Sequence, residues 1–269
     1  MNPPNDALLR VRNLCVHVQS SSQSVFSVQD VFFDIHPAET VALVGESGSG
    51  KTLTALALLG LLPNAAHQTA GEILFKGKQL PSARLRGRHV AMIFQNPSAA
   101  LNPVIRVGHQ IEDVIRTHLR LSAKQAKGET LNLLKLAGLI DGGWVYRAYP
   151  HQLSGGMAQR VMIAMALSCK PDLIIADEPT TALDVITQNQ ILAQIRALQA
   201  EHGFALLLIS HDMNVVARLA DTIVVMRAGR MVESGPAQQL LHDPQHTYTR
   251  TLLNATTGIP NLASPLAHV

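Results

Sequence analysis

Cysteine, aromatic residues and charge are all scarce in this chain of 269 residues. It holds 2 cysteines, Cys15 and Cys169, which lie far apart, so a disulfide-stapled domain is excluded and two buried thiols in a reducing compartment are expected. Aromatic residues make up 4% and charged residues 15% of the chain, and no run of Lys or Arg accompanies the net charge of +3. Nucleic-acid binding is therefore not indicated.

Long hydrophobic runs are absent too. Residues 55–62 form one of the longest, and Gly60 and Pro63 break it well short of the roughly 20 residues that a bilayer crossing needs. Residues 1–6 are polar and rich in proline, which predicts no secretory signal. With 47% hydrophobic residues, the chain is instead expected to fold as a globular protein inside the cell.

Short apolar runs bounded by Gly, Pro or Asp predict buried strands. These runs are residues 40–44, 89–94, 172–176, 205–210 and 222–226. Segments of helical periodicity, such as 53–62 and 186–201, lie between several of them. Because the runs are unbroken rather than alternating, they predict a largely parallel sheet that is covered on both faces.

The beginning and the middle of the chain differ from this pattern. Residues 8–18 and 25–35 alternate more strongly and are followed by 71–75, which predicts a smaller antiparallel sheet beside the core. Residues 96–169 contain little that resembles a strand, so we expect a helical insertion between core strands. Its helix-like stretches are residues 107–121, 123–137 and 158–168.

The strongest local motif directly follows the strand predicted at residues 40–44 and opens the next helix. It matches the pattern GxxxxGK[ST] and consists of Gly45, Glu46, Ser47, Gly48, Ser49, Gly50, Lys51 and Thr52. The glycines allow backbone N–H groups to surround a phosphate, Lys51 supplies a cation, and the Thr52 hydroxyl can ligate Mg²⁺. An ordinary glycine-rich turn is the alternative, but it would not account for the strand, the Lys-Thr pair and the helix occurring together.

A second motif supplies two carboxylates at the end of a buried strand. Asp177 follows four nonpolar residues and is expected to reach Mg²⁺, directly or through water. Glu178 then stands where a carboxylate can polarise the attacking water as a general base. The alternative is that both acids cap the next helix. Beside the phosphate loop, they predict a P-loop NTPase.

A third motif indicates which kind of NTPase. Residues 153–160 read LSGGMAQR and resemble the LSGGxxQR signature of ATP-binding cassette (ABC) proteins. The resemblance implies that Ser154, Gly155 and Gly156 bind the γ-phosphate of an ATP held by the opposite subunit, so that two nucleotides are sandwiched between two domains. A lone Ser-Gly-Gly turn could otherwise be only a helix cap.

Further positions match the ABC family across the chain. Gln95 matches the Q-loop glutamine, which touches Mg²⁺ or water and links the catalytic site to the helical insertion. Residues 182–184 match the D-loop, which crosses the dimer interface. His211 matches the switch histidine, which binds the γ-phosphate and orients Glu178. Phe26 is the candidate for stacking on adenine, with a place in the core as the alternative.

The resemblance implies an α/β fold: a P-loop NTPase (RecA-like) core with an antiparallel β subdomain and an inserted helical subdomain. We expect the β subdomain and the first part of the core in residues 1–95, and the helical signature subdomain in 96–169. The second part of the core should follow in 170–235, with a C-terminal tail in 236–269.

Three stretches resemble the importer ATPases for peptides and nickel in particular, namely residues 93–111, 177–185 and 243–252. Peptide members commonly carry a cysteine-rich tail, whereas no cysteine follows Cys169, and residues 67–74 resemble nickel import ATPases. We therefore expect an ATPase coupled to uptake of nickel or a nickel chelate, with di- or oligopeptide import as the alternative. A soluble ABC ATPase without a transport role and a non-hydrolysing scaffold subunit are weaker alternatives.

The resemblance also implies ligands and partners. ATP and Mg²⁺ are the expected ligands, and a homologous ATPase subunit is the expected partner in a heterodimer. Two membrane permeases and, indirectly, an extracytoplasmic binding protein complete the assembly, at the cytoplasmic face of the cell membrane. His242 and His246 have the spacing of a metal-binding pair on a helix, but Pro244 between them argues against one, so cargo choice is assigned to the other subunits.

Overall fold

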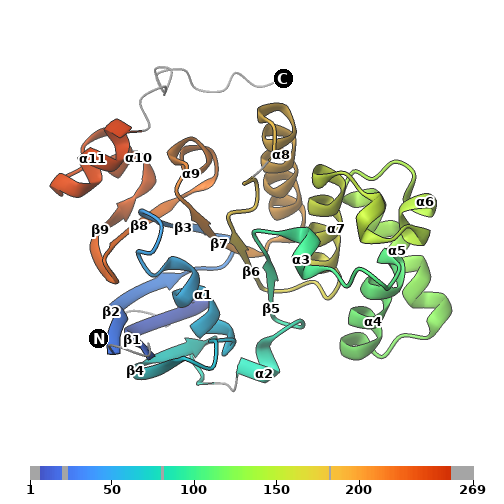
Figure 1. The fold of residues 1–269 in the computed structure, drawn as a ribbon, viewed down its shortest axis with the longest axis horizontal. Coiled ribbons are helices and arrows are strands. Elements are labelled where there is room, and N and C mark those ends of the chain that lie inside the picture. Colours follow the sequence, from blue (N-terminus) through green and yellow to red (C-terminus); the bar gives the residue numbers. More distant parts are fainter. Residues whose placement is uncertain (1–6, 20–23, 80–81, 182, 256–269) are drawn as a thin grey trace.

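A six-stranded sheet forms the centre of the molecule, in the order β5-β6-β7-β3-β8-β9 (Figure 1). The structure is a computed structural model and describes residues 7–19, 24–79, 82–181 and 183–255. The strands are β3 (Thr40–Val44), β5 (Val90–Ile93), β6 (Leu173–Asp177), β7 (Ala205–Ser210), β8 (Thr222–Arg227) and β9 (Arg230–Pro236). All neighbours are parallel except β9, which pairs antiparallel with β8.

Alternate residues of the parallel strands belong to two separate hydrophobic cores. Ala42 and Val44 of β3 are part of one core, whereas Val41 and Leu43 are part of the other. Every residue of β3, β6 and β7 is consequently buried. The unbroken apolar runs in the sequence follow from this arrangement, because both faces of a parallel sheet are covered.

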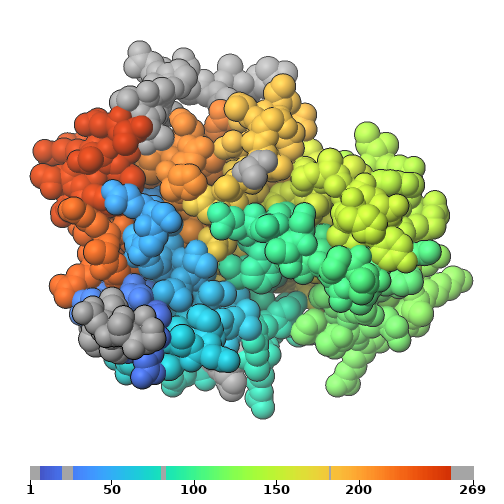
Figure 2. Space-filling model, in the orientation of Figure 1, coloured from blue at the N-terminus to red at the C-terminus, as the bar shows by residue number. Residues whose placement is uncertain are grey.

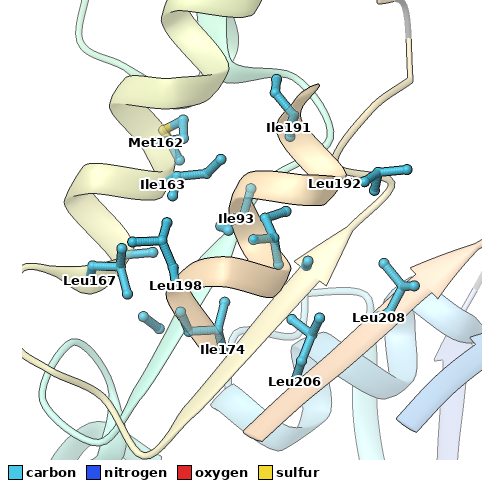
Figure 3. Close-up of a cluster of buried hydrophobic side chains, with 14 of the residues drawn as sticks. Ile93, Met162, Ile163, Leu167, Ile174, Ile191, Leu192, Leu198, Leu206 and Leu208 are labelled. Carbon is cyan, nitrogen blue, oxygen red and sulfur yellow. The ribbon is translucent and has the colours of Figure 1, made fainter. Parts of the chain in front are cut away.

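Helices pack on both faces of this sheet. Figure 3 shows one face, where α7 (Gly155–Leu167) and α8 (Val185–His202) bring side chains such as Ile163 and Leu198 over Ile174 of β6. The other helices of the core are α1 (Lys51–Leu59), α2 (Ser82–Leu85) and α9 (Met213–Leu219).

A group of helices stands at one end of the molecule, between β5 and β6 in the chain (Figure 1). It comprises α3 (Pro97–Ala100), α4 (Val107–Leu119), α5 (Ala123–Leu136), α6 (Gly142–Arg147), the 3₁₀ turn Pro150–Gln152 and α7. The sequence predicted helices for most of this segment, although the exact subdomain boundaries stay a prediction.

A three-stranded antiparallel sheet, in the order β2-β1-β4, packs beside the core. Its strands are β1 (Leu9–Gln19), β2 (Ser24–Ile35) and β4 (Ala66–Phe75). The predicted small sheet is therefore present, with β4 beginning earlier than the apolar run that indicated it. Cys15 on β1 is only partly buried, so the prediction of two buried thiols holds for Cys169 alone.

The C-terminal segment differs from the predicted tail. After β9, which the sequence did not predict, α10 (Ala237–His242) and α11 (Thr247–Ala255) pack onto the core through Leu240, Tyr248 and Leu253. His242 ends α10 and His246 precedes α11, so the pair does not share a helix. Within the described residues, no helix has both the length and the apolar character that a membrane crossing requires.

Candidate functional site

The phosphate loop connects β3 to α1 and is held by Lys51, the first residue of that helix. The Lys51 ammonium donates to the carbonyl oxygens of Gly45 and Glu46, each at 2.8 Å, and to Ser49 Oγ at 3.4 Å. Its side chain is almost fully buried. The Lys51 cation thus lies against the glycine-rich loop, which is the arrangement that receives phosphate in such loops.

Two glycines of the loop are required by close backbone contacts. Gly45 has φ +148° and Gly50 has φ +101°, conformations that favour glycine. A Cβ atom at Gly45 would lie 2.1 Å from the carbonyl oxygen of Met226, and one at Gly50 would lie 2.7 Å from that of Ser27. The loop therefore fits closely between β2 and β8, and no other residue type can replace these two without movement.

Asp177 and Glu178 follow one another at the end of β6, beside the loop. Thr52 Oγ1 donates to Asp177 Oδ1 at 3.3 Å. The Glu178 N–H donates to the carbonyl of Ile209 at 2.9 Å, and its carboxylate accepts from Thr181 Oγ1 at 2.9 Å. Because β7 neighbours β6, His211 at the end of β7 reaches Glu178, with 2.6 Å between Nδ1 and Oε1.

Burial dominates the electrostatics of this group. It lowers the pKa of Lys51, an effect that the nearby charges of Glu178 and Asp177 oppose. Burial also raises the pKa of Asp177, and repulsion from Glu178 adds to this, against the Thr52 hydrogen bond and the Lys51 charge. A hard cation held by Thr52 and Asp177 oxygens would relieve that repulsion, so the donor set fits Mg²⁺.

A cavity of about 900 Å³ brings these residues together. Beyond the loop and the carboxylates of Asp177 and Glu178, it is lined by Gln95, two residues after the end of β5, and by His211. The predicted residues that line it are Glu46, Ser47, Gly48, Gly50, Lys51, Thr52, Gln95, Asp177, Glu178 and His211. Gly45 and Ser49 belong to the same loop without lining the cavity.

The signature triplet lies elsewhere in the chain. Ser154 is the N-cap of α7, where its Oγ accepts from the Met157 N–H at 3.3 Å, and a Cβ at Gly156 would meet Thr187 of α8. Neither these two nor Gly155 lines the cavity. Within one chain, the structure does not bring the triplet to the phosphate loop.

Phe26 lies on β2, paired in register with His17 of β1. The side chain of Phe26 is outside the described part of the chain, as is Ala182 of the predicted D-loop. The proposed contact of Phe26 with adenine therefore stays a prediction.

Comparison with known proteins identifies the family. Residues 28–181, which include the phosphate loop, Asp177 and Glu178, match the family model described as ABC transporter. The chain belongs to the ABC transporter family. The predicted enzyme class, an ATPase of the ABC type, is that of this family, and ATP is the nucleotide that its members bind.

Named relatives match almost the whole chain. The glutathione import ATP-binding protein GsiA of Pectobacterium atrosepticum is 48% identical over 96% of this chain and 44% of its own length. The dipeptide transport ATP-binding protein DppD of Bacillus subtilis is 45% identical over 93% of this chain and 77% of its own length. This chain thus spans less than half of the length of GsiA and most of the length of DppD.

Solved structures confirm the predicted fold class. A dimeric ATP-binding cassette, MJ0796, in a post-hydrolysis state bound to ADP and Pi, superposes with a TM-score of 0.76 at 26% identity. The superposition covers 85% of the chain described here and 98% of the MJ0796 chain. The P-loop NTPase core with its antiparallel sheet and helical insertion is therefore the architecture of ABC cassettes.

Sequence reasoning missed residues that complete the site from the C-terminal segment. Leu252 and Ala255 of α11 line the cavity, and the Tyr248 hydroxyl accepts the Glu46 N–H of the phosphate loop at 3.0 Å. Residues 243–252 resemble a stretch of importer ATPases, but nothing in their pattern indicates a contact with residues about two hundred positions earlier.

Proposed function

We propose that this chain is the ATP-hydrolysing subunit of an ABC importer. The observation that carries the proposal is the meeting of Lys51, the Thr52–Asp177 pair and the Glu178–His211 pair in one cavity. A phosphate-binding loop, a candidate metal carboxylate and a hydrogen-bonded base are the parts that hydrolysis of a nucleoside triphosphate needs.

The chemistry we propose begins at Glu178. Its carboxylate accepts a proton from a water molecule as that water attacks the γ-phosphorus, and the bond from this phosphorus to the β,γ-bridging oxygen breaks. His211 and Thr181 fix the carboxylate through hydrogen bonds of 2.6 and 2.9 Å, so that it is aimed at one position. Mg²⁺ bound by Thr52 and Asp177, with Gln95 nearby, would neutralise charge on the phosphate oxygens.

The signature triplet is proposed to act in trans. Ser154 lies at the N-terminus of α7, where backbone N–H groups are offered to an anion, and it is exposed. Since it lies away from the cavity of its own chain, Ser154 and Gly156 would complete the site of a homologous partner. The dimeric state described for MJ0796 supports this arrangement.

The cargo we propose is a small peptide, of the dipeptide or glutathione class. The relatives GsiA and DppD, named for glutathione and dipeptide transport, support this choice. The expectation of nickel finds no support in these names, and we replace it with its stated alternative. Two permeases, a homologous ATPase and a binding protein remain the proposed partners, at the cytoplasmic face of the membrane.

Uptake assays test both the proposed cargo and the proposed ATP-driven mechanism. In a strain lacking this chain, the wild-type protein should restore uptake of labelled dipeptide or glutathione, and Lys51→Ala should not. Restored nickel accumulation without peptide uptake would contradict the peptide cargo. Equal uptake with Lys51→Ala and wild type would contradict the ATP-driven mechanism itself.

A further inference from the structure

The peptide group between Gly45 and Glu46 is held from both of its ends. Its carbonyl oxygen, on Gly45, accepts from the Lys51 ammonium at 2.8 Å. Its N–H, on Glu46, donates to the Tyr248 hydroxyl at 3.0 Å. One partner belongs to the phosphate loop itself, whereas the other comes from α11, far along the chain.

Tyr248 is itself fixed in place. Only 5% of its surface is exposed, and the guanidinium of Arg227, at the end of β8, lies 4.9 Å from the centre of its ring. A buried ring stacked on a cation has little freedom to turn. Its hydroxyl is therefore presented to Glu46 as a preorganised acceptor.

The segment that carries Tyr248, which we call the C-terminal arm (residues 237–255), is anchored to the sheet. Glu233 of β9 accepts from the backbone N–H groups of Gln245 at 2.8 Å and of His246 at 3.2 Å. Leu253 is buried in the core. In the space-filling view, the arm, in red, lies next to the blue surface of the N-terminal part (Figure 2).

The arm also forms part of the nucleotide cavity, through Leu252 and Ala255. These residues lie about one and two turns beyond Tyr248 on α11, so a single helix contacts the loop and lines the cavity. A change in the shape of the phosphate loop on nucleotide binding would therefore also change the contacts of α11.

We propose that Tyr248 is a positioning residue of the phosphate loop and that the C-terminal arm is part of the nucleotide site. The inference rests on the proposed function of the loop as an ATP site. Lys51 has contacts with Ser49 Oγ and with the carbonyl oxygens of Gly45 and Glu46, so a phosphate that it binds must replace at least one of them. In our proposal the Gly45 carbonyl is among the contacts that are released, which removes one of the two restraints on the Gly45–Glu46 peptide. Tyr248 then holds this peptide alone and keeps the loop in the shape that receives phosphate.

Tyr248→Phe tests the proposal because it removes the hydroxyl and keeps the ring. We expect its dissociation constant for ATP to rise by more than twofold and up to about tenfold, the range for one neutral hydrogen bond. Turnover at saturating ATP should stay within about twofold and the thermal midpoint within about 3 °C of wild type. Tyr146→Phe is the matched control, since the Tyr146 hydroxyl donates to Glu112 at 2.7 Å between α6 and α4, away from the cavity, and this variant should bind ATP as wild type does.

A second measurement needs no variant. Binding of ATP to the wild-type protein should slow hydrogen exchange in peptides covering residues 246–255. An unchanged exchange rate there, or a Tyr248→Phe dissociation constant within twofold of wild type, overturns the proposal. Failure of the wild-type protein to bind ATP at all would instead overturn the proposed function, so the two failures are distinguishable.

Discussion

Glu178 adopts a backbone conformation that non-glycine residues rarely occupy, with φ of +49°. The hydrogen bond from its N–H to Ile209 of β7 holds it there, and His211 and Thr181 fix its carboxylate. Strain of this kind persists where the surroundings define the geometry, and it clusters at functional sites. The conformation therefore adds a physical argument to the role proposed for this side chain.

Glu178→Gln should separate nucleotide binding from hydrolysis. The amide keeps the shape and the contact with Thr181 but cannot accept a proton, so turnover should fall by about a hundredfold or more while ATP affinity stays within a few-fold. Steady-state ATPase assays and nucleotide titration measure the two quantities. Glu201→Gln, an exposed change on α8, is the control, and equal turnover in the two variants would remove Glu178 from the role of base.

Gly45→Ala should reveal how closely β8 packs against the loop. The added methyl group would lie 2.1 Å from the Met226 carbonyl oxygen and would require an unfavourable φ, so the free energy of unfolding should fall by about 2–4 kcal/mol. Gly203→Ala has a positive φ but nothing within 4 Å, and should cost only about 1–2 kcal/mol. Urea unfolding measures both, and equal losses would contradict the contact.

At the scale of elements, two ion pairs of Asp172 join the starts of two neighbouring strands to the end of β4. Asp172, just before β6, is 2.8 Å from His89 Nδ1, just before β5, and 2.7 Å from Lys76 Nζ. Burial disfavours the charged carboxylate, but the hydrogen bonds and charges of Lys76 and His89 outweigh it and lower the pKa of Asp172 below 3.8. Because the folded-state pKa is the lower one, the resulting stability is present above pH 3.8 and lost as the pH falls through the folded-state pKa.

Asp172→Asn should therefore destabilise the protein in a pH-dependent way. At pH 7 the free energy of unfolding should fall by about 1 kcal/mol, a modest value because Asp172 and both of its partners are partly exposed. Near pH 3 the difference in free energy of unfolding between the variant and wild type should become smaller. Denaturant unfolding at both pH values tests this. Asp113→Asn, at an exposed position on α4, is the control, and a difference independent of pH would refute the electrostatic explanation.

Elements whose pattern is local were predictable from the sequence, and elements that depend on distant contacts were not. The parallel strands β3, β6 and β7 are apolar throughout because both faces are buried, so their runs stand out. By contrast, β9 is only half-buried and carries no apolar run. The phosphate loop was found through its spacing, whereas Tyr248 has no motif and gains its role from tertiary contact.

At the scale of the whole molecule, the separation of the signature triplet from the cavity makes a prediction about assembly. Ser154→Lys should leave the affinity of the isolated chain for ATP within twofold of wild type, since Ser154 does not line its own cavity. In the assembled transporter, ATP turnover should fall to half or less, because the site of the partner loses its donor.

Nucleotide binding to the isolated chain and turnover of the assembled transporter measure the two effects of Ser154→Lys. Lys51→Ala is the opposite control, because it should weaken binding already in the isolated chain. Weaker ATP binding by isolated Ser154→Lys would mean that the triplet serves its own chain.

The anchoring of the C-terminal arm also bears on the order in which the protein matures during synthesis. The phosphate loop and both carboxylates leave the ribosome well before Tyr248, Leu252 and Ala255, which supply one wall of the cavity and the second restraint on the loop. A nascent chain can thus form its central sheet while its nucleotide pocket is still open on one side. We therefore expect the affinity for ATP to reach that of the full chain only once residues 248–255 have left the ribosome and packed onto the core.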